Sequence, residues 1–346
     1  MLHFLKSKTS KKVFVFLFII SLAPTLILAA QNKEKGIKIG MVTDVGGIND
    51  QSFNQSAWEG LKRAKTELSI KVSYQESKQD ADYASNLETL TDAKNDLIWG
   101  IGFKMGDKIL AAAKQNPKQK YAIIDVAFEK TPANLIGVLF KSEEPCFLVG
   151  YIAGKMSKTG TIGFVGGIKV PLIQVFQYAY MAGAKYANPK IKIIDQYAES
   201  FTDAAKGKAM ANQMFKQGAD IIFAAAGSVG DGVIEAAKEQ NRMAIGVDRD
   251  QNSLAPDNVI TSAMKRVDNA IFNIAKDLQK GIFKGGTTIT YSLKDGGVDI
   301  APTTSKHVPA SILKEVDKLK TNIISGKLIA PTKESEYNKF LKVHKL

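Results

Sequence analysis

The sequence predicts an α/β protein of two doubly wound lobes, each a mainly parallel sheet covered by helices. Apolar strand-like runs alternate with amphipathic helical runs at a spacing of roughly 25 to 30 residues, as in βαβ units. This series occurs twice along the chain, and no low-complexity linker separates the two copies. We therefore expect several short crossings that form a hinge between the lobes, in place of one flexible tether.

The elements of the first lobe follow from periodicity and turn signals. Strands are expected at 37–44, 71–74, 96–102, 121–125 and 135–140, and helices at 52–67, 80–94 and 106–115. The second series follows a helix at 146–156. Its strands are expected at 161–167, 191–197, 220–225 and 243–247, and its helices at 172–187, 203–217 and 230–240.

The last part of the chain is expected to return to the first lobe before it ends. We assign the strands at 259–262 and 287–293 and the helix at 267–279 to this return, and a terminal helix and lysine-rich tail to the residues beyond 308. The expected domains are therefore a first lobe of residues 36–142 and about 262–295, and a second lobe and tail of residues 143–261 and about 296–346.

Residues 1–30 have the pattern of an export signal peptide. Four lysines precede an apolar run that begins at Val13 and ends with the small residues Ala29 and Ala30. We expect cleavage near Ala30, and the alternative is an uncleaved anchor, because the run is close to the shortest that spans a bilayer. Either way the remaining chain is expected to function outside the cytoplasmic membrane.

The formal net charge is +13, of which four charges come from the lysines of residues 1–30. Nucleic acid is not the expected partner, because the basic residues are scattered singly and are not clustered with aromatics. A solvated, lysine-rich exterior is the expected result, compatible with peripheral association with a membrane of anionic lipid. The single cysteine, Cys146, lies in an apolar run and is expected to be a small buried residue.

The 346 residues include only three histidines, at positions 3, 307 and 344. Their scarcity argues against a histidine-based zinc site and against Ser-His-Asp chemistry. We therefore expect no catalytic residues, metal or cofactor.

The turn between the first strand and the first helix is the leading site candidate. Ser52 and Gln55 match a capping box, which places Phe53 in the first helical turn. At the carboxyl end of a parallel strand this ring has little core to enter and is a candidate ligand platform. Polar residues flank it on both sides, namely Asp44, Asn49, Asp50 and Asn54.

Acidic residues end three of the expected strands: Asp44, Asp125 and Asp248. Three carboxylates at the sheet edges can act as acid and base groups, bind a cation, or accept hydrogen bonds from hydroxyl and amino groups of a neutral ligand. The last role suits them best, because the loop from Asp44 only faintly matches a calcium-binding loop. In a purely structural alternative each acid caps a turn or helix.

Further candidates lie at other strand and helix ends. The glycine cluster that starts at Gly227 lets the backbone approach a ligand, but it lacks the spacing of a dinucleotide or phosphate loop, and a plain tight turn explains it equally well. Lys265 follows a strand end and can donate to a sugar hydroxyl or lie in solvent. Aromatic residues at loop ends can hold a flat ligand or pack in the core, and these are Phe53, Phe176, Phe201 and Phe223.

Three ordered motifs, at 44–54, 226–232 and 245–251, make the chain resemble the basic membrane protein family. These are the purine-nucleoside receptors of ABC transporters, with the type I periplasmic-binding-protein fold. The resemblance implies that Phe53 stacks on the purine with a second ring, which we assign to Phe223. It implies that Asn54 and Asp125 read the base edge beside Asp44, and that Asp248, Lys265 and the Gly227 backbone hold the ribose.

The function that the resemblance implies is capture of a purine nucleoside, whether inosine, guanosine or adenosine, for an ABC transporter permease. Many relatives are lipoproteins, but here Ala29-Ala30-Gln31 replaces the lipid-bearing cysteine, so a periplasmic or cell-surface protein without a lipid anchor at that position is expected. The alternatives are a nucleoside-responsive sensor or adhesin-like surface protein, and a nucleoside hydrolase. The hydrolase needs a metal cluster, and a phosphorylase a phosphate site, neither of which the sequence clearly offers.

Overall fold

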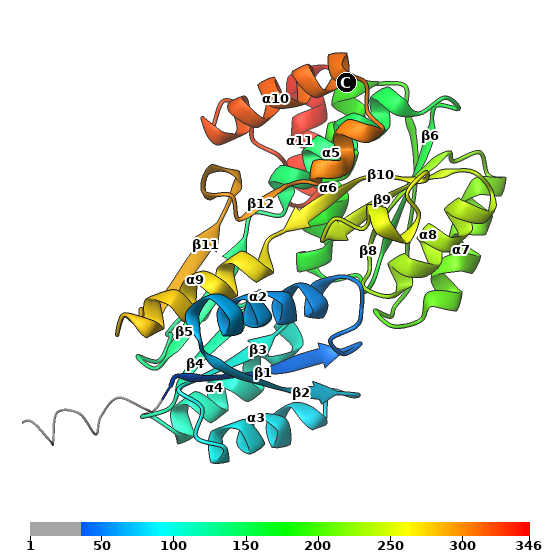
Figure 1. Cartoon of the computed structure of the whole chain (residues 1–346). Helices are drawn as coiled ribbons and strands as arrows, with labels where there is room; N and C mark the ends of the chain where they lie inside the picture. The colour runs from blue at the N-terminus through cyan, green and yellow to red at the C-terminus, as the bar shows by residue number, and fades with distance from the viewer. Residues whose placement is uncertain (1–35) are drawn as a thin grey trace, which may run out of the picture. The chain divides into compact units, whose positions relative to one another are not determined.

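The computed structural model describes residues 36–346, which form two lobes of α/β structure (Figure 1). The first sheet has six strands in the order β11-β5-β4-β3-β1-β2, and every pairing in it is parallel. Its strands are β1 (Lys38–Val45), β2 (Lys71–Ser77), β3 (Leu97–Ile101), β4 (Lys120–Ile124), β5 (Leu135–Phe140) and β11 (Thr287–Tyr291).

Helices cover both faces of this sheet. The apolar sides of α2 (Phe53–Leu68) and α9 (Val267–Gln279) pack on one face, while α3 (Asp82–Asp92) and α4 (Gly106–Gln115) pack on the other. The central strand β3 is buried along its whole length, which explains its unbroken apolar sequence Leu-Ile-Trp-Gly-Ile.

The second sheet repeats this arrangement in the order β12-β10-β9-β8-β6-β7. All of its pairings are parallel except that of β12 with β10. Its strands are β6 (Thr161–Gly166), β7 (Lys192–Tyr197), β8 (Ile221–Ala225), β9 (Met243–Asp248), β10 (Val259–Lys265) and β12 (Val298–Ile300).

One face of the second sheet packs on α7 (Ala204–Lys216) and α8 (Val229–Glu239). The other face packs on α5 (Glu143–Met156) and α6 (Pro171–Ala187), with α10 (Ala310–Ile324) outside them. Cys146 is completely buried in this second core, as its apolar surroundings predict.

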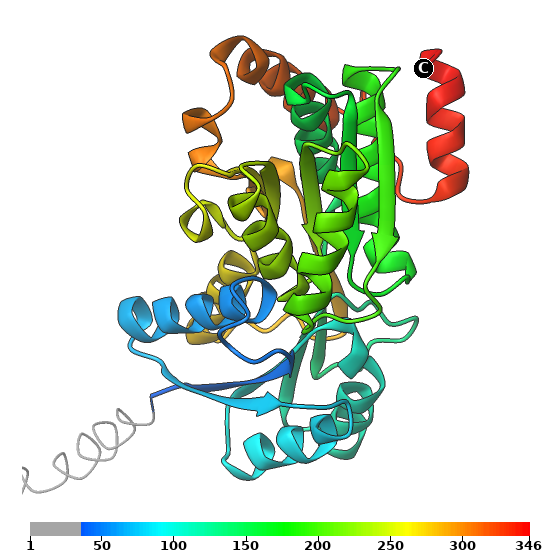
Figure 2. The ribbon, with the colours of Figure 1, turned by 90° about the vertical axis from the view of Figure 1, so that its right-hand side faces the viewer.

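The C-terminal residues form a helix where the sequence suggested a lysine-rich tail. Helix α11 (Glu334–His344), red in Figure 2, packs against α6 and buries Tyr337 and Phe340. The ring of Phe340 lies 5.7 Å from that of Phe147. Tyr337, Phe340 and Leu341 recur at helical spacing, so a short apolar stripe among the lysines is the signal for this helix.

Three short segments join the two sheets within residues 36–346. They are residues 141–142 between β5 and α5, Arg266 between β10 and α9, and residues 292–297 between β11 and β12. The structure corrects one expectation: the strand at 259–262 does not return to the first lobe, because β10 pairs with β9 and β12 in the second sheet. The crossing therefore follows Lys265.

The expected export signal at residues 1–30 lies outside the described residues. Within residues 36–346, no helix combines the length and the apolar character needed to cross a bilayer.

Candidate functional site

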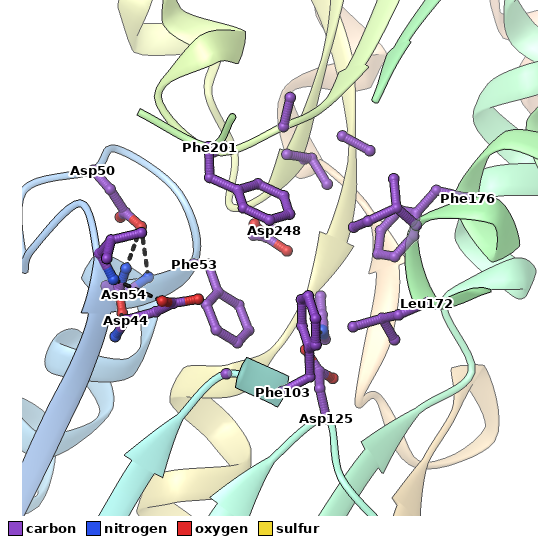
Figure 3. A pocket seen from close by; sticks show the side chains of 18 residues that line it. Asp44, Asp50, Phe53, Asn54, Phe103, Asp125, Leu172, Phe176, Phe201 and Asp248 are labelled. Atoms are coloured by element: carbon purple, nitrogen blue, oxygen red, sulfur yellow. Dashed lines mark hydrogen bonds and ion pairs between the residues drawn. The ribbon is translucent and has the colours of Figure 1, made fainter. Parts of the chain in front are cut away.

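A cavity lies between the carboxyl edges of the two sheets (Figure 3). Small-molecule sites commonly occupy this position in α/β folds. The first lobe lines it with Asp44, Val45, Asp50, Phe53, Asn54, Gly102, Phe103 and Asp125. The second lobe contributes Leu172, Ile173, Phe176, Phe201, Ala225, Ala226, Gly227, Val247, Asp248 and Lys265.

The cavity brings together most of the side chains that the sequence singled out. They come from positions up to 221 residues apart, because the carboxyl ends of parallel strands share one edge of each sheet. The predicted residues in its lining are Asp44, Phe53, Asn54, Asp125, Phe176, Gly227, Asp248 and Lys265. Asn49 and Phe223 are not among them.

Phe223 belongs to the core of the second lobe, and its assignment as a stacking ring is corrected. Its side chain has no exposed surface, and its ring lies 5.2 Å from that of Tyr180 and 5.7 Å from that of Phe164. Strand β8 is buried on both faces, so a ring in the middle of it packs under a helix and does not reach the sheet edge.

Asn49 is exposed, and the structure places it outside the cavity. The turn that carries it is held over the first lobe, where the Ile48 N–H donates to Oε1 of Glu76 at 2.9 Å. The next residue, Asp50, turns inward and is buried.

Asp50, and not Ser52, caps the first turn of α2. Its carboxylate accepts hydrogen bonds from the backbone N–H groups of Ser52, Asn54 and Gln55 at 2.9–3.0 Å. Ser52 makes no capping bond, so the predicted capping box is wrong. Burial raises the pKa of Asp50, and these donated hydrogen bonds oppose the rise.

Asp44, one residue before the end of strand β1, is fixed by three hydrogen bonds. Its Oδ1 accepts from the Val45 N–H at 2.7 Å and in a short contact from the hydroxyl of Tyr83, and its own N–H donates to Oδ1 of Asn54 at 3.0 Å. Burial raises the pKa of Asp44, while the bonds from Tyr83 and Val45 oppose the rise. Among residues 36–346 no hydrogen bond is made to Oδ2, which is therefore the atom left for a ligand.

The amide of Asn54 is used within the first lobe. Its Oδ1 accepts from Asp44, and its Nδ2 donates to Oδ2 of Asp50 at 2.9 Å. Asn54 therefore positions the two carboxylates, and one N–H and one lone pair remain for contact with a ligand.

Lys265 and Asp125 form an ion pair across the cavity. The ammonium of Lys265, from β10, lies 2.5 Å from Oδ2 of Asp125, which follows β4, and both side chains are more than 90% buried. The same ammonium lies 4.8 Å from the centre of the Phe53 ring, which is within cation–π range. The paired charge can still donate two further N–H bonds into the cavity.

Asp248 ends β9 in the second sheet as Asp125 follows β4 in the first. Both residues have positive φ angles, 63° at Asp248 and 69° at Asp125, a conformation that aspartate tolerates better than most residues. Oδ2 of Asp248 accepts from the Ser52 hydroxyl of the first lobe at 2.5 Å. Burial raises the pKa of Asp248 to about 6, although Lys265 and Ser52 favour its ionised form.

Gly227 brings backbone to the cavity wall at the end of β8. Its φ is +56°, and a Cβ there would lie 2.8 Å from the carbonyl oxygen of Phe201. A side chain would therefore strain both the turn and the loop that carries Phe201.

Four aromatic rings belong to the apolar part of the lining, beside several aliphatic side chains: Phe53, Phe103, Phe176 and Phe201. Figure 3 shows Phe53 and Phe201 entering from opposite lobes. Phe103 meets Phe201 edge to face, with centroids 6.5 Å apart. Phe103 was missed, and the available signal was its position directly after the glycine that ends the third strand. Phe201 was among the aromatic candidates at loop ends, although the sequence assigned the second stacking ring to Phe223, and it lies in the loop after β7.

The polar part of the cavity is acidic in a basic protein. Asp44, Asp50, Asp125 and Asp248 surround a single lysine, Lys265. Carboxylates accept hydrogen bonds and repel anions, so this lining suits a ligand with hydroxyl or amino donors and a flat apolar portion.

The chain matches the family model for Bmp, ABC transporter substrate-binding protein PnrA-like, over residues 37–334. Among curated relatives, basic membrane protein A of Borreliella afzelii is 46% identical over 315 residues, which cover 89% of this chain and 96% of that protein. The ABC transporter nucleoside-binding protein BmpA of Lactococcus lactis subsp. cremoris is 39% identical over 318 residues, covering 86% and 90% of the two chains.

Solved structures agree with this match. An ABC transporter solute-binding protein from Aeropyrum pernix K1 superposes with a TM-score of 0.80 at 29% identity, covering 89% of this chain and 97% of that one. The predicted type I periplasmic-binding-protein fold is thereby confirmed, as is the resemblance drawn from the three motifs.

Proposed function

Because the chain belongs to the Bmp family of PnrA-like ABC transporter substrate-binding proteins, we propose that it captures purine nucleosides in the interlobe cavity and delivers them to an ABC-type importer. The observation that carries the proposal is the composition of one cavity, in which rings from both lobes stand beside buried carboxylates and a lysine.

The aromatic rings suit the purine base. Phe53 comes from the first lobe and Phe201 from the second, so a flat ligand between them contacts both lobes at once. Base stacking on an aromatic side chain contributes roughly 1–3 kcal/mol for each base. We assign the second stacking ring to Phe201 in place of Phe223.

The polar groups at the other end suit the ribose. A carboxylate such as Asp248 accepts two hydroxyl hydrogen bonds from a vicinal diol, and bonds to an ionised acceptor are roughly twice as strong as neutral ones. Lys265 can donate to the same hydroxyl groups while it stays paired with Asp125. The free Oδ2 of Asp44 accepts from an N–H on the base edge.

The charge of the cavity favours a nucleoside over a nucleotide. A 5′-phosphate would enter a space with four carboxyl groups and one ammonium, so its negative charge would be repelled. The ligand is therefore a neutral nucleoside, and the protein works outside the cytoplasmic membrane, where the expected signal peptide would direct it.

Calorimetric titration of the purified protein tests this proposal. Inosine, guanosine and adenosine are compared with free hypoxanthine, free ribose and inosine 5′-monophosphate. We expect at least one nucleoside to bind with micromolar or tighter affinity, about −8 kcal/mol, and the three controls to bind at least about a hundredfold more weakly. A folded protein that binds no nucleoside, or binds the monophosphate as tightly, would contradict the proposal.

Two further measurements separate the competing classes. Mass spectrometry of the small molecule that copurifies with the protein identifies the preferred nucleoside. Release of hypoxanthine from inosine would instead indicate a hydrolase. Uptake of labelled inosine by cells with and without the protein tests delivery to an importer, and unchanged uptake despite tight binding would favour a sensor.

A further inference from the structure

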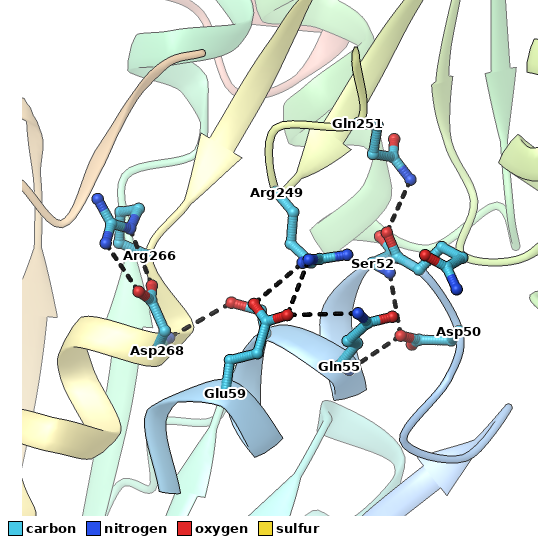
Figure 4. A network of polar contacts seen from close by, with 10 residues as sticks. Asp50, Ser52, Gln55, Glu59, Arg249, Gln251, Arg266 and Asp268 are labelled. Atoms are coloured by element: carbon cyan, nitrogen blue, oxygen red, sulfur yellow. Dashed lines mark hydrogen bonds and ion pairs between the residues drawn. The ribbon is translucent and has the colours of Figure 1, made fainter. Parts of the chain in front are cut away.

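A set of polar contacts joins the two lobes beside the cavity but outside its lining (Figure 4). The guanidinium of Arg249, in the second lobe, donates two hydrogen bonds to Glu59 on α2. Nη2 lies 2.8 Å from Oε1, and Nε lies 3.2 Å from Oε2. Nearby, Nε2 of Gln251 donates to the backbone carbonyl of Gln51 at 3.0 Å. We name these four residues the interlobe latch.

The geometry of the Arg249–Glu59 pair is that of a specific contact. Two parallel N–H···O bonds match the planar guanidinium to the carboxylate, which a lysine cannot do. The two side chains are 24% and 35% exposed, so solvent screens them less than it screens a pair on the open surface.

Each side of the latch is held in place within its own lobe. Glu59 accepts from Nε2 of Gln55 one helical turn earlier, at 3.3 Å. In the second lobe, Oε1 of Gln251 accepts from the Val247 N–H at 2.9 Å, and the Gln251 N–H donates to the Ser262 hydroxyl at 3.1 Å. The partners are therefore preorganised, which reduces the entropy lost when the lobes meet.

The latch lies on the same two segments that carry groups of the cavity. Arg249 directly follows Asp248, and Phe53 lies between Gln51 and Glu59 in sequence. The bond from the Ser52 hydroxyl to Asp248 links these two segments at the cavity itself. A movement that brings Asp248 toward Phe53 therefore also forms the latch.

We propose that Arg249 and Glu59, supported by Gln251, are positioning residues that hold the lobes closed and set the rate at which ligand leaves. None of the latch side chains lines the cavity, so the effect acts through closure. The inference rests on the proposed function, in that a nucleoside is the ligand whose release is measured.

Stopped-flow measurement of inosine dissociation from the full-length protein tests the latch. The variants are Glu59→Gln, Arg249→Gln and the double variant, together with the charge swap Glu59→Arg with Arg249→Glu. Lys208→Gln is the matched control, because Lys208 pairs with Glu235 and Glu239 at 3.0 and 2.8 Å within the second lobe.

We expect each single variant to release inosine roughly three- to tenfold faster, and the double variant to resemble the singles because both lose the same contact. The charge swap should restore part of the loss, and the control should match the wild type. Raising the salt from about 0.1 to 1 M shortens the screening length from about 10 to 3 Å. Release should therefore become faster in the wild type but not in Arg249→Gln.

Unchanged release in both single variants, or losses that add in the double variant, would overturn the proposal. If the wild type binds no nucleoside, the proposed function fails on its own, and small-angle scattering of the ligand-free proteins then tests the latch. A larger radius of gyration in Arg249→Gln than in both the wild type and Lys208→Gln supports the latch, and equal radii refute it.

Discussion

Replacement of Phe53 and of Phe223 by alanine should separate a ligand platform from a core residue. Phe53 lines the cavity and is partly exposed, with the Lys265 ammonium 4.8 Å from its ring centre. Phe53→Ala removes base stacking of roughly 1–3 kcal/mol, so the nucleoside dissociation constant should rise roughly 5- to 150-fold. The ring faces a cavity on one side, so the free energy of unfolding without ligand should fall by only about 1 kcal/mol or less.

Phe223→Ala should show the reverse pattern. This ring is fully buried against Phe164 and Tyr180, and removal of a buried phenylalanine costs about 3–5 kcal/mol of stability. The folded fraction should still bind nucleoside with nearly normal affinity, because the cavity lining is unchanged.

Calorimetry gives the nucleoside dissociation constant of each variant, and urea unfolding gives the free energy of unfolding of each. A loss of more than about 3 kcal/mol in the unfolding free energy of ligand-free Phe53→Ala would mean that Phe53 belongs to the core. Normal nucleoside affinity in this variant would refute the stacking role directly.

Three other substitutions test separate parts of the site. Phe201→Ala should weaken nucleoside binding by roughly 1–3 kcal/mol in calorimetry, and normal affinity would exclude it as the second ring. Burial raises the pKa of Asp248 from 3.8 to about 6, so the folded state holds its proton more tightly, and the stability from this group is lost as the pH rises from about 4 to 6. Without ligand, Asp248→Asn should therefore have a free energy of unfolding up to roughly 3 kcal/mol higher than the wild type at pH 7.5, and no such gain at pH 4. Its inosine affinity should fall at least about tenfold. Equal stability of the two proteins at pH 7.5 would contradict the burial argument. Asp50→Ala removes a cap from three backbone N–H groups at the start of α2 and should cost roughly 1–2 kcal/mol in urea unfolding. Unchanged stability would show that water replaces the cap.

Local patterns predicted the strands and helices well because each element buries a periodic apolar face. The run before Asp44 and the run before Asp248 mark strand ends, and in a parallel sheet such ends converge at one edge. The sequence alone therefore predicts that Asp44, Asp125 and Asp248 share one site. Helix α11 was missed because its apolar stripe is short and lies among lysines.

The capping box at Ser52 does not form, because the Ser52 side chain is used between the lobes. In a capping box its Oγ would accept from a backbone N–H of its own helix. In the folded protein the hydroxyl instead donates to Asp248, 196 residues away. Asp50 takes over the cap. A contact between lobes leaves no trace in the local pattern of either segment.

The fold class, the family motifs and the strand-end acids could be predicted from the sequence, because they depend on periodicity and on the ends of individual strands. Which ring faces the cavity depends instead on how the lobes pack. The sequence named both Phe201 and Phe223 as aromatic candidates at loop ends, yet Phe201 lies on a loop at the sheet edge and Phe223 in the middle of a strand buried on both faces. The tertiary structure likewise decided the pairing of Arg249 with Glu59, since that contact exists only when the two lobes meet.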